Sequence, residues 1–169
     1  MYLMKNYHHL SETELRLLNE LVGSVVNGFT AADCYHTLGK FAYTLANKII
    51  LETEGQSLCI ELLHSSSSSQ PLFGLLNVTE QTKPEGFAVN LILPAWSVIS
   101  KIEVWAEKIT DNNENTVVAE NTLLFAIESG LRILICPEHP EDSLGLYCDE
   151  MEIESILGTG RFLLKHIMD

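Results

Sequence analysis

The sequence predicts an α+β protein, in which two N-terminal helices pack on a mainly antiparallel, curved β-sheet or partly open barrel of about six to eight strands. Three observations lead to this prediction. Apolar residues recur at three- and four-residue steps near the N-terminus. Short strand-like runs follow one another further along the chain, and only short turns join them. Such strands usually pair in antiparallel fashion, and helices that precede them are segregated from the sheet.

The first expected helix covers residues 12–27. Ser11 and Glu14 have the spacing of a capping box, which satisfies the free N–H groups at the start of a helix. Gly28 suits the left-handed conformation in which many helices end. One side of this helix would be apolar and buried, and it would carry Leu15, Leu18, Leu21, Val22, Val25, Val26 and Phe29.

A second helix is expected over residues 31–46, where Thr30 and Asp33 could cap its start. Apolar side chains again fall broadly on one side, at Ala32, Tyr35, Leu38, Ala42 and Leu45. Gly39 weakens this prediction, because a glycine inside a helix costs about 1 kcal/mol relative to alanine.

The pattern then changes from helical to extended. Residues 48–54 and 57–63 predict a hairpin that turns at Glu54-Gly55-Gln56. The serine-rich residues 65–71 are expected to form a flexible loop, because they carry little side chain that could be buried. Further strands are expected at 72–79, 87–93, 97–109, 117–127 and 131–136, of which the last two form a hairpin.

The C-terminal stretch leaves two interpretations open. Residues 149–157 fit a helix, whereas residues 160–168 fit either a helix or an edge strand. The chain of 169 residues is expected to form one domain, 1–169, with a loose N-terminus over residues 1–10.

Composition indicates a soluble globular protein. Hydrophobic residues make up 46% of the chain and charged residues 20%. No apolar run approaches the roughly 20 residues that a membrane helix needs. The four cysteines lie in mixed surroundings, and the N-terminus does not look like a secretory signal. These features indicate a reducing compartment, and we expect a cytoplasmic location.

Charge is the unusual part of the composition. The net charge is −13, and residues 111–169 hold twelve Asp and Glu against three Lys and Arg. A negative field of this size repels nucleic acid and anionic membranes, so neither is expected as a partner. It would instead attract a basic protein and speed its association. The expected protein-binding residues are Glu138, Glu141, Asp142, Asp149, Glu150 and Glu152.

Cys136, His139 and Cys148 lie in the same stretch and are residue types that zinc prefers. A structural zinc site needs four ligands, and only a carboxylate or a distant histidine, such as His64 or His166, could be the fourth. Cysteine also serves often as a small buried hydrophobic residue. We therefore expect packing for both cysteines, with no metal and no other cofactor.

Catalytic motifs are lacking: the chain has no G-x-S-x-G, no H-E-x-x-H and no C-x-x-C. Cys34 and His36 are two residues apart, so they would lie on different faces of a helix and on the same face only in a strand. A catalytic pair is therefore not expected. Trp96 and Trp105 are expected in the core, although they could also line a pocket or a protein-facing patch.

The leading hypothesis is a non-enzymatic protein-binding module, of the inhibitor or immunity type, that engages a basic partner. One alternative is a carrier of a small apolar ligand, with its pocket between the helices and a curved sheet. The other is an enzyme whose Asp, Glu and His residues are dispersed along the chain and leave no local motif. A mean hydropathy of +0.13 also leaves room for homo-oligomers.

Overall fold

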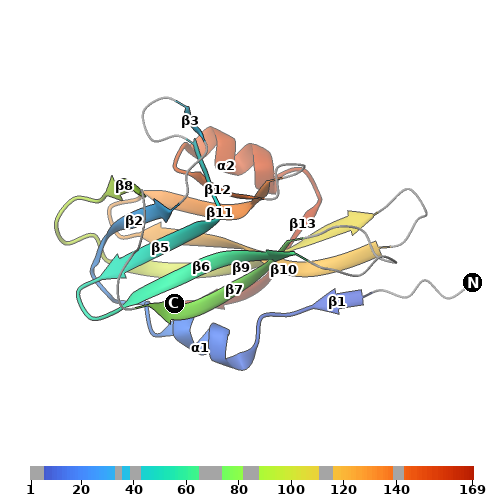
Figure 1. The fold of residues 1–169 in the computed structure, drawn as a ribbon, viewed down its shortest axis with the longest axis horizontal. Coiled ribbons are helices and arrows are strands. Elements are labelled where there is room, and N and C mark those ends of the chain that lie inside the picture. Colours follow the sequence, from blue (N-terminus) through green and yellow to red (C-terminus); the bar gives the residue numbers. More distant parts are fainter. Residues whose placement is uncertain are drawn as a thin grey trace, which may run out of the picture.

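The strands of the computed structural model form two sheets that face each other across an apolar interior (Figure 1). The structure describes residues 6–32, 36–38, 43–64, 74–81, 88–110, 116–138 and 143–169. The elements in these ranges are β1 (Asn6–His8), α1 (Glu12–Asn19), β2 (Val26–Ala32), β3 (His36–Leu38), β4 (Tyr43–Ala46), β5 (Lys48–Thr53), β6 (Ser57–His64), β7 (Gly74–Gln81), β8 (Ala88–Ile92), β9 (Ile99–Thr110), β10 (Thr116–Ile127), β11 (Arg132–Glu138), β12 (Ser143–Tyr147), α2 (Glu150–Leu157) and β13 (Phe162–Met168).

The larger sheet has eight strands. Its order is β13-β9-β10-β11-β12-β4-β3, and β1 pairs with β10 in parallel. The second sheet has five strands in the order β7-β6-β5-β2-β8. Apart from the β1–β10 pair, the pairings in both sheets are antiparallel, which confirms the predicted antiparallel character.

The predicted α+β class is wrong. The protein is mostly β, with one short helix near the N-terminus and one near the C-terminus, and neither sheet closes into a barrel. Two N-terminal helices do not pack on one sheet, because the second of them is replaced by strands. Neither helix in the described ranges is long and apolar enough to cross a membrane.

The first predicted helix is correct only at its start. Ser11 and Glu14 form the expected capping box, but α1 ends at Asn19. Gly23 then adopts φ of +81°, and Val26 enters β2. Valine favours strands because its branched side chain packs well on a pleated surface. Pairing of β2 with both β5 and β8 therefore overrides the helical spacing of its apolar residues.

The second predicted helix, 31–46, is wrong. The described parts of this region form the end of β2, all of β3 and all of β4, whereas residues 33–35 and 39–42 lie outside the described ranges. β4 is held between β3 and β12, so its extended conformation satisfies the backbone groups on both sides. Tyr43 and Thr44 also favour strands.

Most of the later strands agree with the prediction. The hairpins β5–β6 and β10–β11 are confirmed, as is the long strand β9. β7 and β8 also form, but they lie at opposite edges of the five-stranded sheet and do not pair with each other. The open C-terminal stretch resolves into helix α2 and edge strand β13, whereas β12 was not predicted. The loop expected at 65–71 lies outside the described residues.

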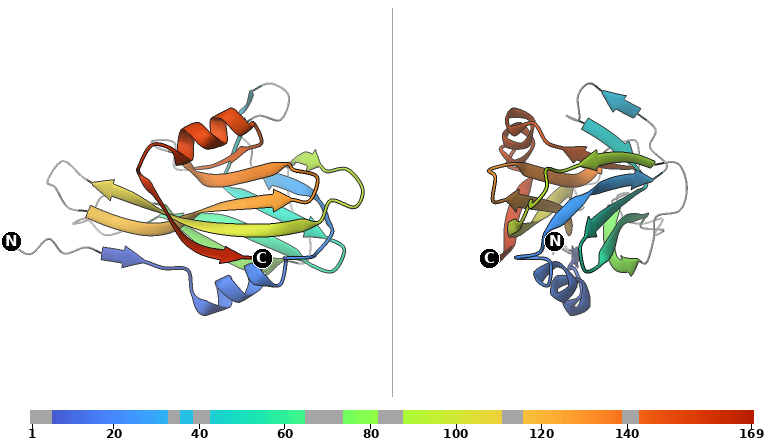
Figure 2. Two further views of the ribbon diagram at one scale, coloured as in Figure 1. Left: turned by 180° about the vertical axis from the view of Figure 1, so that it is seen from behind. Right: turned by 90° about the vertical axis from the view of Figure 1, so that its left-hand side faces the viewer.

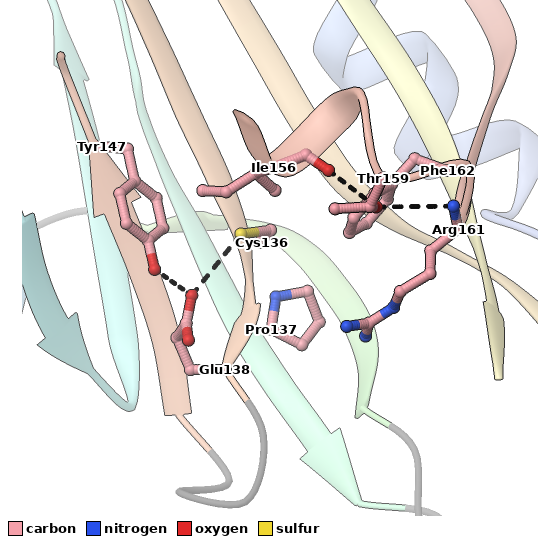
Figure 3. Close-up of a pocket in the computed structure, with 8 residues that line it drawn as sticks. All are labelled: Cys136, Pro137, Glu138, Tyr147, Ile156, Thr159, Arg161 and Phe162. Atoms are coloured by element: carbon pink, nitrogen blue, oxygen red, sulfur yellow. Dashed lines mark hydrogen bonds between the residues drawn. The ribbon is translucent and has the colours of Figure 1, made fainter. Parts of the chain in front are cut away.

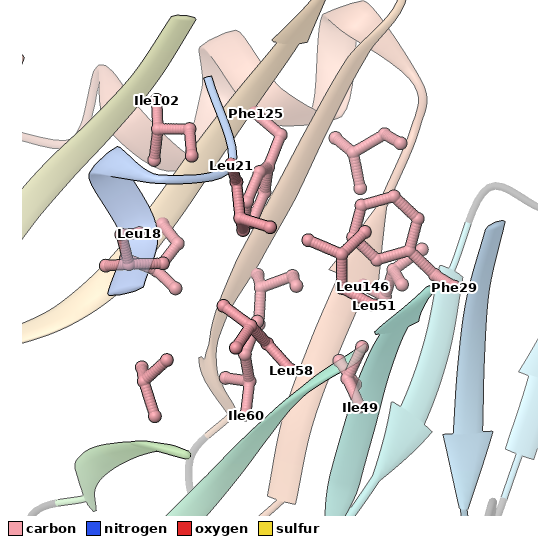
Figure 4. Close-up of a cluster of buried hydrophobic side chains, with 14 of the residues drawn as sticks. Leu18, Leu21, Phe29, Ile49, Leu51, Leu58, Ile60, Ile102, Phe125 and Leu146 are labelled. Atoms are coloured by element: carbon pink, nitrogen blue, oxygen red, sulfur yellow. The ribbon is translucent and has the colours of Figure 1, made fainter. Parts of the chain in front are cut away.

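The main core fills the space between the sheets. Leu18 and Leu21 contribute to it from the first helix and the turn that follows it (Figure 4). Phe29 from β2 and Phe125 from β10 meet edge to face, with ring centroids 5.6 Å apart. A second, smaller cluster lies beneath α2, and it consists of Leu124, Leu134, Cys136, Tyr147 and Ile153.

Candidate functional site

Helix α2 packs on the face of the eight-stranded sheet that is turned away from the five-stranded sheet (Figure 2). Asp149 caps its start by accepting hydrogen bonds from the N–H groups of Met151 and Glu152, at 3.0 and 3.1 Å. Ile153 is fully buried against the sheet. The cap and this anchor hold the helix in one position, so its opposite side faces outward.

Arg132 of β11 ties the helix to the sheet a second time. Its guanidinium donates hydrogen bonds to the carboxylates of Glu150 and Glu154, which are four residues apart and hence lie on the same side of the helix. Burial alone would lower the pKa of Arg132, but the two carboxylates outweigh burial and raise that pKa above its ordinary value. The contact keeps both carboxylates in defined positions.

The outward side of α2 combines one large apolar side chain with carboxylates. This apolar residue is Met151, which is 82% exposed. Glu150 and Glu152 flank it in sequence, and Glu154 lies one helical turn further on. Arg132 pairs with two of these carboxylates, Glu150 and Glu154. Glu152 and the cap Asp149 add two further negative charges, so this surface is acidic.

The predicted acidic residues only partly come together. Asp149, Glu150 and Glu152 belong to α2, where one caps the helix, one pairs with Arg132 and one is exposed. Glu138 lies apart, in β11, where its carboxylate accepts a hydrogen bond from the Tyr147 hydroxyl (Figure 3). The two other predicted residues, Glu141 and Asp142, are outside the described ranges.

Sequence reasoning missed both Met151 and Arg132. Within a helix over residues 149–157, Met151 falls opposite the apolar positions 153, 156 and 157, so a helical projection could have singled it out. The contact of Arg132 with α2 spans 18 residues to Glu150 and could not be read from local spacing.

The two cysteines of the candidate zinc set belong to different apolar clusters. Cys136 packs beneath α2, whereas Cys148 packs against the main core, and His139 is outside the described residues. In the described part of the chain, no group of three or more His, Cys, Asp and Glu could hold a metal ion. Burial raises the pKa of Cys148 to about 11 and that of Cys136 well above its ordinary value, so both are thiols at neutral pH.

His166, which sequence analysis considered as a distant ligand, instead contacts Glu120. Nε2 of His166 and Nδ1 of His9 lie 3.2 and 2.9 Å from Oε1 of Glu120, and the Leu10 N–H donates to Oε2 at 3.0 Å. Burial alone would raise the pKa of Glu120, but these hydrogen bonds and the charge of His166 lower it below its ordinary value. This cluster joins the N-terminal segment to β10 and β13.

The two tryptophans have different environments. Trp105 lies half-buried beside the cluster under α2, and its indole N–H donates to Glu103 at 3.0 Å. Trp96 is 78% exposed and adopts φ of +67°, so the expectation that it packs in the core is wrong.

No family model matches the chain, and no curated protein or solved structure matches it. By its fold and site, this is a two-sheet, mainly antiparallel β protein that presents an acidic helix on the outer face of its larger sheet.

Proposed function

We propose that the protein is a non-enzymatic protein-binding module, of the inhibitor or immunity type, that presents α2 to a basic partner. The observation that supports this most is the exposure of Met151 on a helix whose other side is firmly anchored. Large exposed apolar side chains ringed by charge are characteristic of protein-binding sites, and methionine is enriched in them.

Each part of the surface has a distinct task in this proposal. Full burial of a methionine side chain contributes roughly 1.5–3 kcal/mol to binding, so Met151 is the anchor. The carboxylates on either side attract a basic partner over a distance and accelerate its association. Because Arg132 and Asp149 hold the helix in place, little conformational entropy is lost when a partner docks.

Affinity capture at low and high ionic strength tests the proposal. The immobilised wild-type protein is compared with Met151→Ser and Glu152→Lys, and both changes are expected to abolish retention of a basic protein that is bound at low salt. Ile92→Ser and Glu54→Lys are matched controls, because these exposed side chains belong to other elements. The proposal fails if the wild type retains no basic protein at low salt, or if the controls lose it equally.

A second function, binding of a small molecule, is favoured by a separate observation. A pocket of about 200 Å³ opens beside α2, between β11, β12 and the turn before β13. Polar and charged side chains line much of it, so it does not suit the purely apolar ligand that the sequence suggested.

A further inference from the structure

Two charged side chains define the pocket beside α2. Figure 3 shows the carboxylate of Glu138 and the guanidinium of Arg161 on opposite sides of Pro137. Ile156 and Phe162 supply apolar surface between the helix and β13. The volume of about 200 Å³ is below the roughly 300–1,000 Å³ typical of drug-sized ligands, so the pocket suits one small organic molecule.

The negative side of the pocket is built around Glu138. The Tyr147 hydroxyl donates to its Oε1, and the Cys136 thiol lies 3.9 Å from the same atom. Since the thiol is buried and protonated, it adds no charge and is a poor nucleophile, which favours binding over covalent chemistry here. The carboxylate is therefore the negative group that a ligand would meet on this side.

Gly145 makes this arrangement possible. A Cβ at this position would lie 2.6 Å from Cε2 of Tyr147 and 2.9 Å from Oε1 of Glu138. Gly145 pairs with Cys136 in the middle of the sheet, where glycine is otherwise unfavourable. The missing side chain leaves the space in which the tyrosine ring and the carboxylate come together.

The positive side of the pocket is Arg161. Its Nη2 donates to Oε1 of Glu107, a buried carboxylate whose other oxygen accepts a hydrogen bond from Asn121 at 3.0 Å. The side chain of Arg161 is 53% exposed, so much of it faces solvent. A guanidinium has five N–H donors, and those not directed to Glu107 can bind a carboxylate of a ligand.

We propose that this pocket binds a small zwitterion of the α-amino acid class with an apolar side chain. Its ammonium group would lie by Glu138 and Tyr147, its carboxylate by Arg161, and its side chain against Ile156 and Phe162. A ligand with one charge would be attracted by one side of the pocket and repelled by the other, whereas a zwitterion matches both. The site is distinct from the outward side of α2 and goes beyond the proposed protein binding.

Isothermal titration calorimetry with three related probes tests this assignment. The probes are leucine, 3-methylbutylamine, which lacks the carboxylate, and 4-methylpentanoate, which lacks the ammonium group. Leucine is expected to bind at least about tenfold more tightly than either of the others, because each removes one charge-assisted hydrogen bond. Equal binding of a singly charged probe, or no leucine binding in the millimolar range, overturns the proposal.

Two variants assign the charges to the two sides of the pocket. Glu138→Gln is expected to weaken leucine and the amine at least about tenfold. Binding of the acid should become tighter, because the carboxylate that repels it is gone. Arg161→Lys is expected to weaken leucine and the acid, because lysine cannot make the same forked contact, and to leave the amine unchanged. Glu128→Gln, an exposed carboxylate in another turn, is the control and should alter none of them. Equal weakening of all three probes by either pocket variant contradicts the assignment, and thermal unfolding verifies that each variant folds.

Discussion

The carboxylate of Glu120 and the imidazole of His9 lie 2.9 Å apart, although 111 residues separate them in the chain. Glu120 is almost completely buried, and it is held in addition by His166 and by the Leu10 N–H. One carboxylate thus connects the segment before α1 to the central strand β10 and the edge strand β13. Its ionisation should matter for the stability of the fold.

Replacement of Glu120 by Gln is expected to lower the free energy of unfolding at pH 7 by about 1–3 kcal/mol, because a buried charge-assisted hydrogen-bond network is lost. The pKa of Glu120 is lowered in the folded state from 4.5, so its ionised form stabilises the protein above that pH. This contribution disappears as the pH falls through the folded-state pKa.

Urea unfolding at neutral and acidic pH measures this effect. The difference between wild type and Glu120→Gln should shrink as the pH falls from 4.5 through the folded-state pKa. Glu80→Gln is the control, because Glu80 is exposed on β7. If the difference in free energy of unfolding stays constant across this pH range, Glu120 stabilises the fold by packing and not by its charge.

Gly145→Ala should destabilise the protein by roughly 1–3 kcal/mol, since the added methyl group would overpack the contact between Tyr147 and Glu138. Gly55→Ala is the matched control, because a Cβ at Gly55 meets no heavy atom within 4 Å. Its expected effect on the free energy of unfolding is within about 0.5 kcal/mol. Equal effects of the two changes in urea unfolding would contradict the close approach at Gly145.

The attachment of α2 can be divided between packing and charge. Ile153→Ala should lower the free energy of unfolding by about 2–5 kcal/mol, because it leaves a cavity beneath the helix. Arg132→Gln should lower the free energy of unfolding by less than about 1 kcal/mol for each ion pair that it removes. The effect is small because Glu150 and Glu154 are largely exposed and solvent screens both pairs. Urea unfolding in low and high salt distinguishes the two, and only the arginine effect should depend on salt.

The buried thiols should react slowly in the native protein. Cys59 and Cys136 are buried and Cys148 is half-buried; all three are free, and burial raises the pKa of each thiol. In a Cys34→Ser variant, a thiol reagent at pH 8 should therefore react slowly until denaturant is added. Rapid modification of the native variant would contradict the burial of these side chains.

Alkaline pH offers a second measurement on Cys148. Its pKa is about 11 in the folded state, above the ordinary value of 9.0, so the protonated thiol stabilises the fold. This contribution is complete below pH 9 and declines as the pH rises towards 11. Cys148→Ser should have a smaller alkaline loss of unfolding free energy than the wild type.

Predictions from sequence succeeded where a structure depends on neighbouring residues. Ser11 and Glu14 mark the start of α1, because a capping box is completed within four residues. The hairpins β5–β6 and β10–β11 likewise need only a short turn between two alternating runs. The same logic placed a helix at 149–157 and three of the acidic residues, Asp149, Glu150 and Glu152, on it.

Residues 31–46 show where such reasoning ends. Their apolar spacing fits a helix, but the described part of this segment pairs with β5, β8 and β12, of which β8 and β12 lie far away in the chain. The hydrogen bonds and buried area gained in those sheets exceed the small differences in helix propensity. None of those distant partners can be recognised within the segment itself.

For this protein, the amino-acid sequence by itself determined the start of α1, the tight hairpins and the acidity of the C-terminal third. Only the tertiary structure decided that strands replace the second helix, that Arg132 binds the carboxylates of α2, and that Glu138 faces Arg161 across a pocket. The physical reason is range: caps and turns are stabilised by adjacent residues, whereas strand pairing and side-chain clusters draw their free energy from residues brought together by folding.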